Sequence, residues 1–219
     1  MKAQGRTYLV TGGAPPPGLA CARRLTTQGA CVFIVDSNAD ACAAVAAALG
    51  PRVRCAVADV SSEADMKNAV AAAAAHGNGD GLRGLIHCAG IALGERVLGN
   101  GSVPTLELFT RVVQVNLIGT FNASRAAAAA MARTQPDEDG ERGVIIHTAS
   151  ISAFEGQIGQ AAYAASKGGV AAMTLPMARE LARLGIRVVA IAPGVFETPL
   201  LAAMPEKVRD SLQQQTVFP

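Results

Sequence analysis

Six short apolar segments, separated by longer stretches with helical periodicity, constrain the fold of this chain more than any other feature of its sequence. The segments have the length and the β-branched content of buried strands, and they lie at residues 7–11, 31–35, 53–58, 85–89, 144–149 and 187–192. Helices are expected at residues 18–28, 38–49, 62–75, 105–133 and 161–184. Because this alternation produces βαβ units, the sequence predicts an α/β fold. We expect a doubly wound parallel sheet with strand order 3-2-1-4-5-6 and helices on both faces.

Length and composition indicate a globular protein of one domain. The 219 residues fit a single domain over residues 1–219, and no apolar run is long enough to cross a bilayer, although half of the residues are apolar. The formal net charge is +2, the basic residues are dispersed, and the aromatic residues are six phenylalanines and two tyrosines. Since this composition suits neither a phosphate-tracking surface nor a base-stacking platform, we expect no nucleic-acid partner and no membrane partner.

The cysteines and the N-terminal residues bear on the compartment. Five cysteines lie singly in apolar segments, without CxxC spacing: Cys21, Cys31, Cys42, Cys55 and Cys88. This pattern predicts separate, reduced thiols in the core. The sequence runs directly into the first expected strand, which leaves no room for a signal or transit peptide. We therefore expect a cytoplasmic location.

A hydroxyl, a phenol and an ammonium group follow the fifth apolar segment at fixed spacings. Ser150 comes directly after the expected strand, and Tyr163 and Lys167 lie four residues apart on one face of the next helix. A cation beside a phenol favours the phenolate, so Lys167 is expected to lower the pKa of Tyr163 and make it an acid or base near neutral pH. Ser150 could bond the same substrate oxygen. The alternative is structural, because such pairs also occur on ordinary helix surfaces and serines often form turns.

A glycine-containing turn joins the first expected strand to the first helix. Gly12 and Gly18 have the outer spacing of a turn whose backbone approaches a pyrophosphate at a helix N-terminus. Asp36 ends the second strand, where a carboxylate can accept hydrogen bonds from an adenosine ribose. Its charge would repel a 2′-phosphate, which favours NAD over NADP. The alternative for Asp36 is a turn former.

Together these residues resemble the short-chain dehydrogenase/reductase family, whose fold is of Rossmann type, over nearly the whole chain. The family motifs correspond in order to the turn at 11–18, Asp59-Val60, Cys88-Ala89-Gly90, Asn116, Ser150, Tyr163 with Lys167, Pro193-Gly194 and Thr198. Within the family, segments such as TASISAFEGQIGQAAYAASKGG are similar to the type-2 3-hydroxyacyl-CoA dehydrogenases, which also act on hydroxysteroids.

The resemblance implies a role for each matching residue. Tyr163 would be the general acid/base, Lys167 would lower its pKa and hold the nicotinamide ribose, and Ser150 would orient the substrate oxygen. Asn116 would hold a water molecule in a proton relay, and Gln160 would lie near the substrate. Tyr163 is also implied to contact the cofactor, and the remaining positions implied to do so are Asp59, Val60, Cys88, Ala89, Gly90, Phe196 and Thr198.

The resemblance also implies a reaction and partners. The reaction is the reversible, NAD-dependent oxidation of a secondary alcohol to a ketone, with a 3-hydroxyacyl-CoA as substrate. A hydroxysteroid or another hydrophobic alcohol is the alternative substrate. Because family members associate through the helices that match 105–133 and 161–184, we expect a homodimer or a homotetramer. The alternative from another class is a non-catalytic binding protein that keeps the fold.

The chain departs from the family at two places. Pro15, Pro16 and Pro17 stand where the family has a serine, a glycine and an apolar residue, and proline has no backbone N–H and a fixed φ. The lost hydrogen bonds are expected to weaken NAD binding by roughly two to four orders of magnitude. The chain also ends after segment 195–215, the family's substrate lid, without the family's last strand. We therefore expect a C-terminally incomplete sheet with an exposed edge.

Two histidines and one proline need a separate interpretation. His87 and His147 lie in expected strands, and we interpret both as core residues, not as bases or ligands. With three histidines in the chain and no cluster of ligands, we expect no metal site. Pro176 is expected to kink the helix that carries Tyr163 without ending it.

Overall fold

The computed structural model describes residues 2–99, 103–196 and 209, and it confirms the predicted alternation. The strands are β1 (Thr7–Thr11), β2 (Cys31–Asp36), β3 (Val53–Val57), β4 (Leu82–His87), β5 (Gly143–Thr148) and β6 (Ile186–Ile191). The helices are α1 (Gly18–Thr27), α2 (Ala39–Leu49), α3 (Glu63–Ala74), α4 (Glu107–Val113), α5 (Gly119–Met131) and α6 (Ala161–Ala182). A π-helical turn, Gln114–Ile118, joins α4 to α5, and a 3₁₀ turn, Ile151–Ala153, follows β5.

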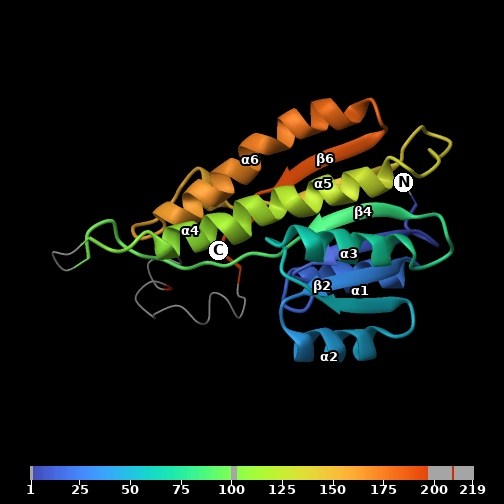
Figure 1. The fold of residues 1–219 in the computed structure, drawn as a ribbon, viewed down its shortest axis with the longest axis horizontal. Coiled ribbons are helices and arrows are strands. Elements are labelled where there is room, and N and C mark those ends of the chain that lie inside the picture. The colour runs from blue at the N-terminus through green and yellow to red at the C-terminus, as the bar shows by residue number, and fades with distance from the viewer. Residues whose placement is uncertain (1, 100–102, 197–208, 210–219) are drawn as a thin grey trace.

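The six strands form one parallel sheet, as predicted. Their order is β3-β2-β1-β4-β5-β6, so the chain reverses its direction of winding between β1 and β4. Within the described residues β6 forms one edge of the sheet. Figure 1 shows the long helices α5 and α6 beside the β4 to β6 half. In such sheets a ligand binds at the carboxyl ends of the strands, at the point of reversal.

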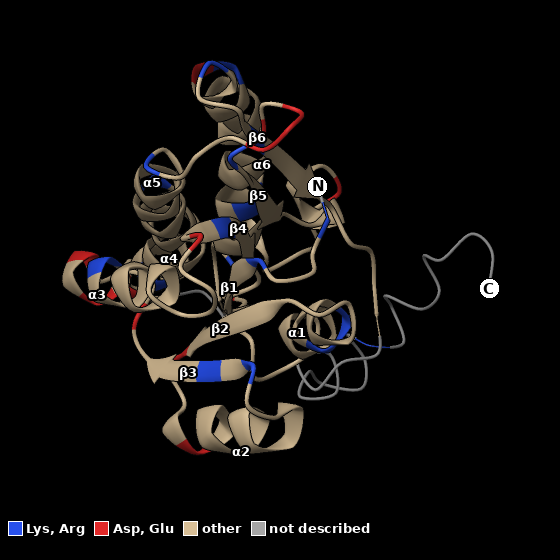
Figure 2. Ribbon diagram, turned by 90° about the vertical axis from the view of Figure 1, so that its right-hand side faces the viewer, with Lys and Arg blue, Asp and Glu red and all other residues tan. Residues whose placement is uncertain are grey.

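Alternating side chains of the central strands build two cores, one on each face of the sheet. Leu9, Phe33 and Val35 pack with α3, α5 and the end of α6, whereas Val10 and Ile34 pack with α1 and α2. This is the two-sided burial that parallel strands require, because successive side chains point to opposite faces. The end-on view of Figure 2 shows α3 and α5 on one side of the sheet and α1 on the other. Acidic and basic residues are interspersed over this view.

Strand β4 begins earlier than its apolar pattern predicted. It starts at Leu82, three residues before the expected start at residue 85. Two unexpected residues explain this. Gly84 leaves room for the ring of Tyr8, which a Cβ would meet, and Arg83 turns its Nη1 to the carbonyl oxygen of Gln135 at 2.7 Å. A charged residue and a glycine are unusual in a buried strand, so the apolar pattern does not predict that the strand begins here. Arg83 is accommodated by its hydrogen bond to Gln135, and Gly84 by its packing against Tyr8.

The predicted helix 105–133 is confirmed as helical backbone from Glu107 to Met131, with a π-helical turn in its middle. The π-helical turn between α4 and α5 contains Asn116, which is fully buried. Helix α6, by contrast, continues through Pro176 to Ala182, as expected. None of the helices that the structure describes is both long and apolar enough to span a membrane.

The prediction of five separate thiols is wrong for two of them. Cys42 on α2 and Cys55 on β3 form a disulfide, with their Cα atoms 5.6 Å apart. Their separation of 13 residues crosses a helix, a turn and a strand, so no short spacing motif revealed the pair. Cys21, Cys31 and Cys88 are free.

Candidate active site

The catalytic candidates meet at the carboxyl end of β5. Ser150 follows this strand, while Tyr163 and Lys167 lie on α6, which packs against β5, β6 and the 3₁₀ turn. The Lys167 ammonium donates to the carbonyl oxygen of Thr148, with 2.6 Å between Nζ and oxygen, and Nζ lies 5.8 Å from the centre of the Tyr163 ring. The structure therefore brings all three predicted side chains to one place.

Burial controls the protonation of this group. It lowers the pKa of Lys167 to about 8, and the nearby Cys88 opposes that shift. Burial also raises the pKa of Tyr163, against the lowering effect of a hydrogen bond with the Ser150 hydroxyl. The expectation that the Tyr163 pKa is lowered is therefore wrong, because desolvation of the phenolate outweighs the favourable contacts. At neutral pH the phenol is protonated.

Ser150 is held by local backbone contacts. Its Oγ accepts a hydrogen bond from the Ser152 N–H at 3.1 Å, so the serine caps the 3₁₀ turn, and its side chain is nearly buried. The Ile151 N–H bonds the Pro193 carbonyl at 3.1 Å, which ties this turn to the segment after β6. Ser150 is thus both a cap, as the structural alternative proposed, and a hydrogen-bond partner of Tyr163.

Gln160 lies beside the same turn. Its Oε1 accepts hydrogen bonds from the Ser152 hydroxyl and from the Gln157 N–H, each at 3.3 Å. The Gln160 carbonyl accepts from the Ala164 N–H at 2.7 Å, at the beginning of α6. Gln160 therefore fixes how the turn after Ser150 meets the helix that carries Tyr163.

Asn116 connects the end of β4 to α6. Its Oδ1 accepts from the Ile91 N–H at 2.8 Å, and its Nδ2 donates to the Ile91 carbonyl at 2.9 Å and to the Ser166 hydroxyl at 3.1 Å. A Cβ on Gly90 would lie 3.2 Å from Asn116 Oδ1 and 3.7 Å from Lys167 Nζ. Asn116 thus positions the segment that borders Lys167. The predicted role in holding a water molecule remains a prediction.

The glycine turn packs against the segment after β4. Gly12 has φ +59°, and a Cβ there would lie 2.6 Å from the Ala89 nitrogen, while a Cβ on Gly18 would collide with the Gly12 carbonyl. Both positions therefore require glycine. Five residues predicted to contact the cofactor thus lie together at the carboxyl ends of β1 and β4, where the winding of the sheet reverses. They are Gly12, Gly18, Cys88, Ala89 and Gly90.

Cys88 has a partner in this region that the sequence analysis missed. The Cys21 thiol, on the first turns of α1, is hydrogen-bonded to the Cys88 thiol, which lowers the pKa of Cys21 to about 7 and raises that of Cys88. The Thr148 hydroxyl also donates to Cys88 Sγ at 3.8 Å. Cys21 had been assigned to the core, because it lies in an apolar segment and only the packing of α1 places it at the turn.

Two carboxylates on neighbouring strand ends have different surroundings. Asp36 accepts from the Ala14 N–H at 3.2 Å and the Asn38 N–H at 3.1 Å, so it lies against the glycine turn. Asp59 is exposed and accepts from the N–H and the hydroxyl of Ser61, both at 2.8 Å. Asp36 has the position of a ribose ligand.

The next residue, Val60, packs inward. It is buried, and its carbonyl accepts from Asn122 Nδ2 at 2.9 Å. A Cβ on Gly119 would lie 2.7 Å from Val60 Cγ2, so Val60 supports the beginning of α5. Phe196 is two-thirds exposed at the end of the described segment. Thr198 and most of segment 195–215 lie outside the described residues.

The three prolines change what the turn can offer to a dinucleotide. Pro15, Pro16 and Pro17 are exposed, and Pro17 precedes the first residue of α1 as its N-cap, so it is not the first helical residue. The Leu19 N–H bonds the Pro15 carbonyl at 3.1 Å, and the Ala14 N–H is already bonded to Asp36. The turn keeps the close approach that Gly12 and Gly18 allow, and Asp36 fits a ribose. Its three prolines offer no backbone N–H to a pyrophosphate.

Both strand histidines are core residues, as predicted. His87 Nδ1 pairs with Thr11 Oγ1 at 2.8 Å, and burial lowers the His87 pKa to about 3. His147 lies between the hydroxyls of Ser124 and Thr174, at 2.9 and 3.0 Å, and burial lowers its pKa to about 4. Both rings are neutral at physiological pH. In the part of the chain that the structure describes, no three His, Cys, Asp or Glu side chains are arranged to hold a metal ion.

The parallel sheet, the glycine turn at its point of reversal and the Ser–Tyr–Lys group define a dinucleotide-dependent oxidoreductase of the Rossmann class. The family model described as short chain dehydrogenase matches residues 6–209, so the chain belongs to the short-chain dehydrogenase family, which acts on CH–OH groups with NAD(P).

Similar proteins include enzymes of known activity. 3-Hydroxyacyl-CoA dehydrogenase type-2 of Homo sapiens is 50% identical over 99% of this chain and 83% of its own length. The Drosophila melanogaster protein of that name is 47% identical, over 96% of this chain and 83% of its own length. The crystal structure of 3-hydroxyacyl-CoA dehydrogenase type-2 from Mycobacterium avium matches with a TM-score of 0.87 and 39% identity, covering 95% of this chain and 82% of that one. The 3-ketoacyl-(acyl-carrier-protein) reductase of Brucella melitensis, complexed with NADH, matches with a TM-score of 0.82 and 33% identity, covering 95% and 83%.

Proposed function

We propose that this protein catalyses the reversible, NAD-dependent oxidation of a 3-hydroxyacyl-CoA to the 3-ketoacyl-CoA. The observation that carries the proposal is the convergence of Ser150, Tyr163 and Lys167 at the end of β5. Relatives named 3-hydroxyacyl-CoA dehydrogenase type-2, at 47–50% identity over 96–99% of the chain, support this substrate class. A hydroxysteroid or another hydrophobic alcohol is the second candidate substrate.

Tyr163 is the group that exchanges a proton with the substrate. In the direction of reduction, its protonated phenol donates to the developing alkoxide, and the Ser150 hydroxyl holds the same oxygen. In the direction of oxidation, the phenolate accepts the alcohol proton, so the rate should rise with pH because burial raises the Tyr163 pKa. A bound nicotinamide supplies the hydride acceptor or donor. Lys167, held by the Thr148 carbonyl, places its ammonium beside the phenol ring.

The cofactor preference that we propose rests on Asp36. This carboxylate lies against the turn after β1, where the adenosine ribose is bound in Rossmann-type folds. Its charge repels a 2′-phosphate, so NAD is favoured over NADP. Gly12, Gly18, Asp59, Val60 and the segment Cys88 to Gly90 complete the proposed dinucleotide site.

We also propose that the protein is a homodimer that pairs through its long helices. Phe109 on α4, Phe121 on α5 and Leu175 on α6 are 43%, 49% and 55% exposed, so apolar rings and side chains face outward on these helices. Light scattering should give twice the monomer mass. A monomer at micromolar concentration would contradict the dimer.

The direct test of the function is NADH formation from 3-hydroxybutyryl-CoA in the presence of NAD, followed by absorbance. A steroid alcohol and 3-hydroxybutyrate without CoA serve as comparison substrates. Highest kcat/KM for the CoA ester supports the proposal. If only the steroid alcohol is oxidised, the substrate would be a hydroxysteroid and not a 3-hydroxyacyl-CoA. If no alcohol is oxidised at saturating NAD, the result would favour a non-catalytic binding protein. The three prolines in the glycine turn are the observation that supports this alternative.

A further inference from the structure

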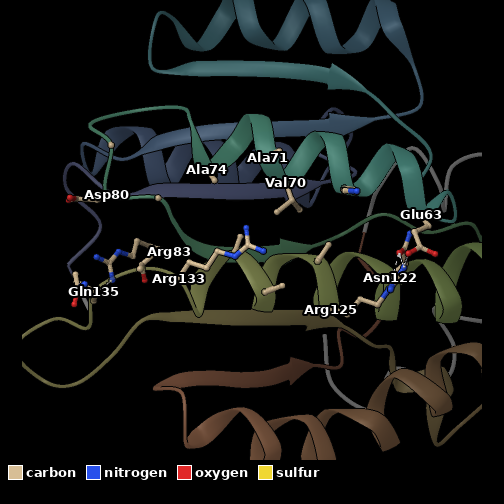
Figure 3. Close-up of a pocket in the computed structure, with 17 residues that line it drawn as sticks. Glu63, Val70, Ala71, Ala74, Asp80, Arg83, Asn122, Arg125, Arg133 and Gln135 are labelled. Atoms are coloured by element: carbon tan, nitrogen blue, oxygen red, sulfur yellow. Dashed lines mark hydrogen bonds and ion pairs between the residues drawn. The ribbon is translucent and has the colours of Figure 1, made fainter.

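A groove of about 750 Å³ lies between α3 and α5 (Figure 3). It exists because the two helices face each other with short side chains, and its floor consists of Val70, Ala71, Ala74, Ala126, Ala129 and Ala130. None of the residues found to line it belongs to the catalytic group of Asn116, Ser150, Tyr163 and Lys167. Its volume is within the range of pockets that hold small ligands.

Arg83, at one end of the groove, is an incompletely bonded buried cation. The residue is 8% exposed, and its Nη1 donates to the Gln135 carbonyl at 2.7 Å. Its buried Nε has no hydrogen-bond partner among the described residues, and no bond from Nη2 or ion pair to a carboxylate is found there. Arg83 Nη2, which has no hydrogen-bond partner among the described residues, is the group of this guanidinium that is left to donate to a phosphate oxygen.

Two further basic side chains line the same groove. Figure 3 shows the Arg133 side chain, which comes two residues after the end of α5, extending into the groove toward α3. Arg133 and Lys67 are exposed, and neither has an ion-pair partner within the part of the chain that the structure describes. At the opposite end, the Glu63 carboxylate forms an ion pair with Arg125 at 2.9 Å. Asp80 is the other acidic residue among those that line the groove. The groove therefore has an excess of positive charge.

We propose that this groove binds a small phosphate monoester. Arg83 and Arg133 hold the phosphate, since two guanidinium groups that line one groove without carboxylate partners are stabilised by an anion between them. Lys67 adds a cation along the α3 wall. The alanine floor receives the apolar or flat part of the ligand, because it offers contact area without competing polar groups. This site is separate from the proposed dinucleotide site.

Nuclear magnetic resonance of the arginine Nε–H groups tests the proposal directly. The full chain is titrated with inorganic phosphate at constant ionic strength, and the Arg83 signal is assigned with Arg83→Lys. The Arg83 Nε–H resonance should shift and saturate in the millimolar range, and Arg133→Gln should weaken the binding by about tenfold. Arg183→Gln is the matched control, since it removes an exposed arginine from the end of α6 and should leave the affinity unchanged.

Several results would overturn the proposal. A linear, non-saturating shift, or equal affinity in the wild type and Arg133→Gln, would exclude a phosphate site at Arg83. If Arg83→Lys does not fold, the calorimetric affinity of the wild type and Arg133→Gln for phosphate decides the same question. Phenyl phosphate should bind more tightly than inorganic phosphate, and equal affinities would contradict the role of the alanine floor. If a polyglutamate peptide binds saturably and phosphate does not bind, the phosphate proposal is wrong and the groove binds an acidic protein segment.

Discussion

The turn after β1 and the end of β5 contribute differently to this protein. At the end of β5, the three side chains proposed to carry the reaction, Ser150, Tyr163 and Lys167, lie together. At the turn, Gly12 and Gly18 keep the close backbone approach, but three consecutive prolines replace residues with amide donors. We infer that proton transfer and dinucleotide affinity depend on separate parts of this fold. On this account the protein keeps its chemistry but binds its cofactor weakly.

The largest expected effect tests the end of β5. Tyr163→Phe removes the phenol that we propose exchanges the substrate proton, and kcat should fall by about 10³-fold or more. Tyr8→Phe, on buried strand β1, is the matched control and should keep the wild-type kcat. The NAD dissociation constant of Tyr163→Phe should stay within about threefold of wild type, since this change leaves the glycine turn intact. Comparable turnover by the two variants would show that Tyr163 is not the acid/base.

The next largest effect tests the turn. Pro15→Ser, Pro16→Gly and Pro17→Leu together restore three backbone donors and one flexible position, and the NAD affinity should rise by about 10²-fold or more. Calorimetric titration measures the change, and kcat at saturating NAD should remain nearly constant. Pro51→Ser, at an exposed turn before β3, is the matched control for a proline replacement. Unchanged affinity in the triple variant would mean that the prolines do not limit binding, and that the two regions do not differ as we describe.

A smaller effect concerns cofactor choice at the turn. Asp36→Asn removes the charge but keeps an acceptor for the Ala14 N–H, so the preference for NAD over NADP should fall by about tenfold, or ~1.4 kcal/mol. The ratio of kcat/KM for the two cofactors measures it. Asp40→Asn, on the first turn of α2, controls for the loss of a nearby exposed charge. An unchanged ratio would remove Asp36 from the account of specificity.

The smallest effect is a pH dependence of stability at the end of β5. The folded-state pKa of Lys167 is about 8, below its ordinary value, so the unfolded state binds more protons above pH 8. The free energy of unfolding should therefore rise with pH from about 8 toward 10, by about 1–2 kcal/mol. Above that range the raised Tyr163 pKa acts in the opposite direction, because the unfolded phenol ionises first.

Urea unfolding of the wild type and Lys167→Met between pH 7 and pH 10 measures this dependence. The rise attributed to Lys167 should be absent in Lys167→Met. Arg179→Met, an exposed cation on the same helix, should keep the wild-type slope. A rise of equal size in Lys167→Met would assign the effect to other groups.

The sequence predicted the fold because each strand is a buried apolar segment and each helix follows it with helical periodicity. It could not predict where β4 begins, since Arg83 and Gly84 belong to the strand only through contacts with Gln135 and Tyr8. The Cys42–Cys55 disulfide was missed for the same reason, because its partners meet only when α2 packs on β3. Tertiary contacts decide such features, and local patterns do not contain them.

The sequence predicted which residues meet at the candidate site, but it did not predict the direction in which the Tyr163 pKa is shifted. Ser150, Tyr163 and Lys167 follow from spacing on a strand end and a helix. The rise of the Tyr163 pKa depends on how far the surrounding chain excludes water, which the spacing does not reveal. Likewise, the contacts of Asn116 with Ile91 and Ser166 depend on the π-helical turn, which no local sequence pattern predicts.

The most direct test of the central claim is the initial rate of NADH formation from saturating 3-hydroxybutyryl-CoA as a function of NAD concentration. We expect a KM for NAD in or above the millimolar range, together with a kcat on the order of 1–10³ s⁻¹, as for ordinary enzymes. This result would show intact chemistry with weakened cofactor binding. A submicromolar KM, or no turnover at any NAD concentration, would contradict the account.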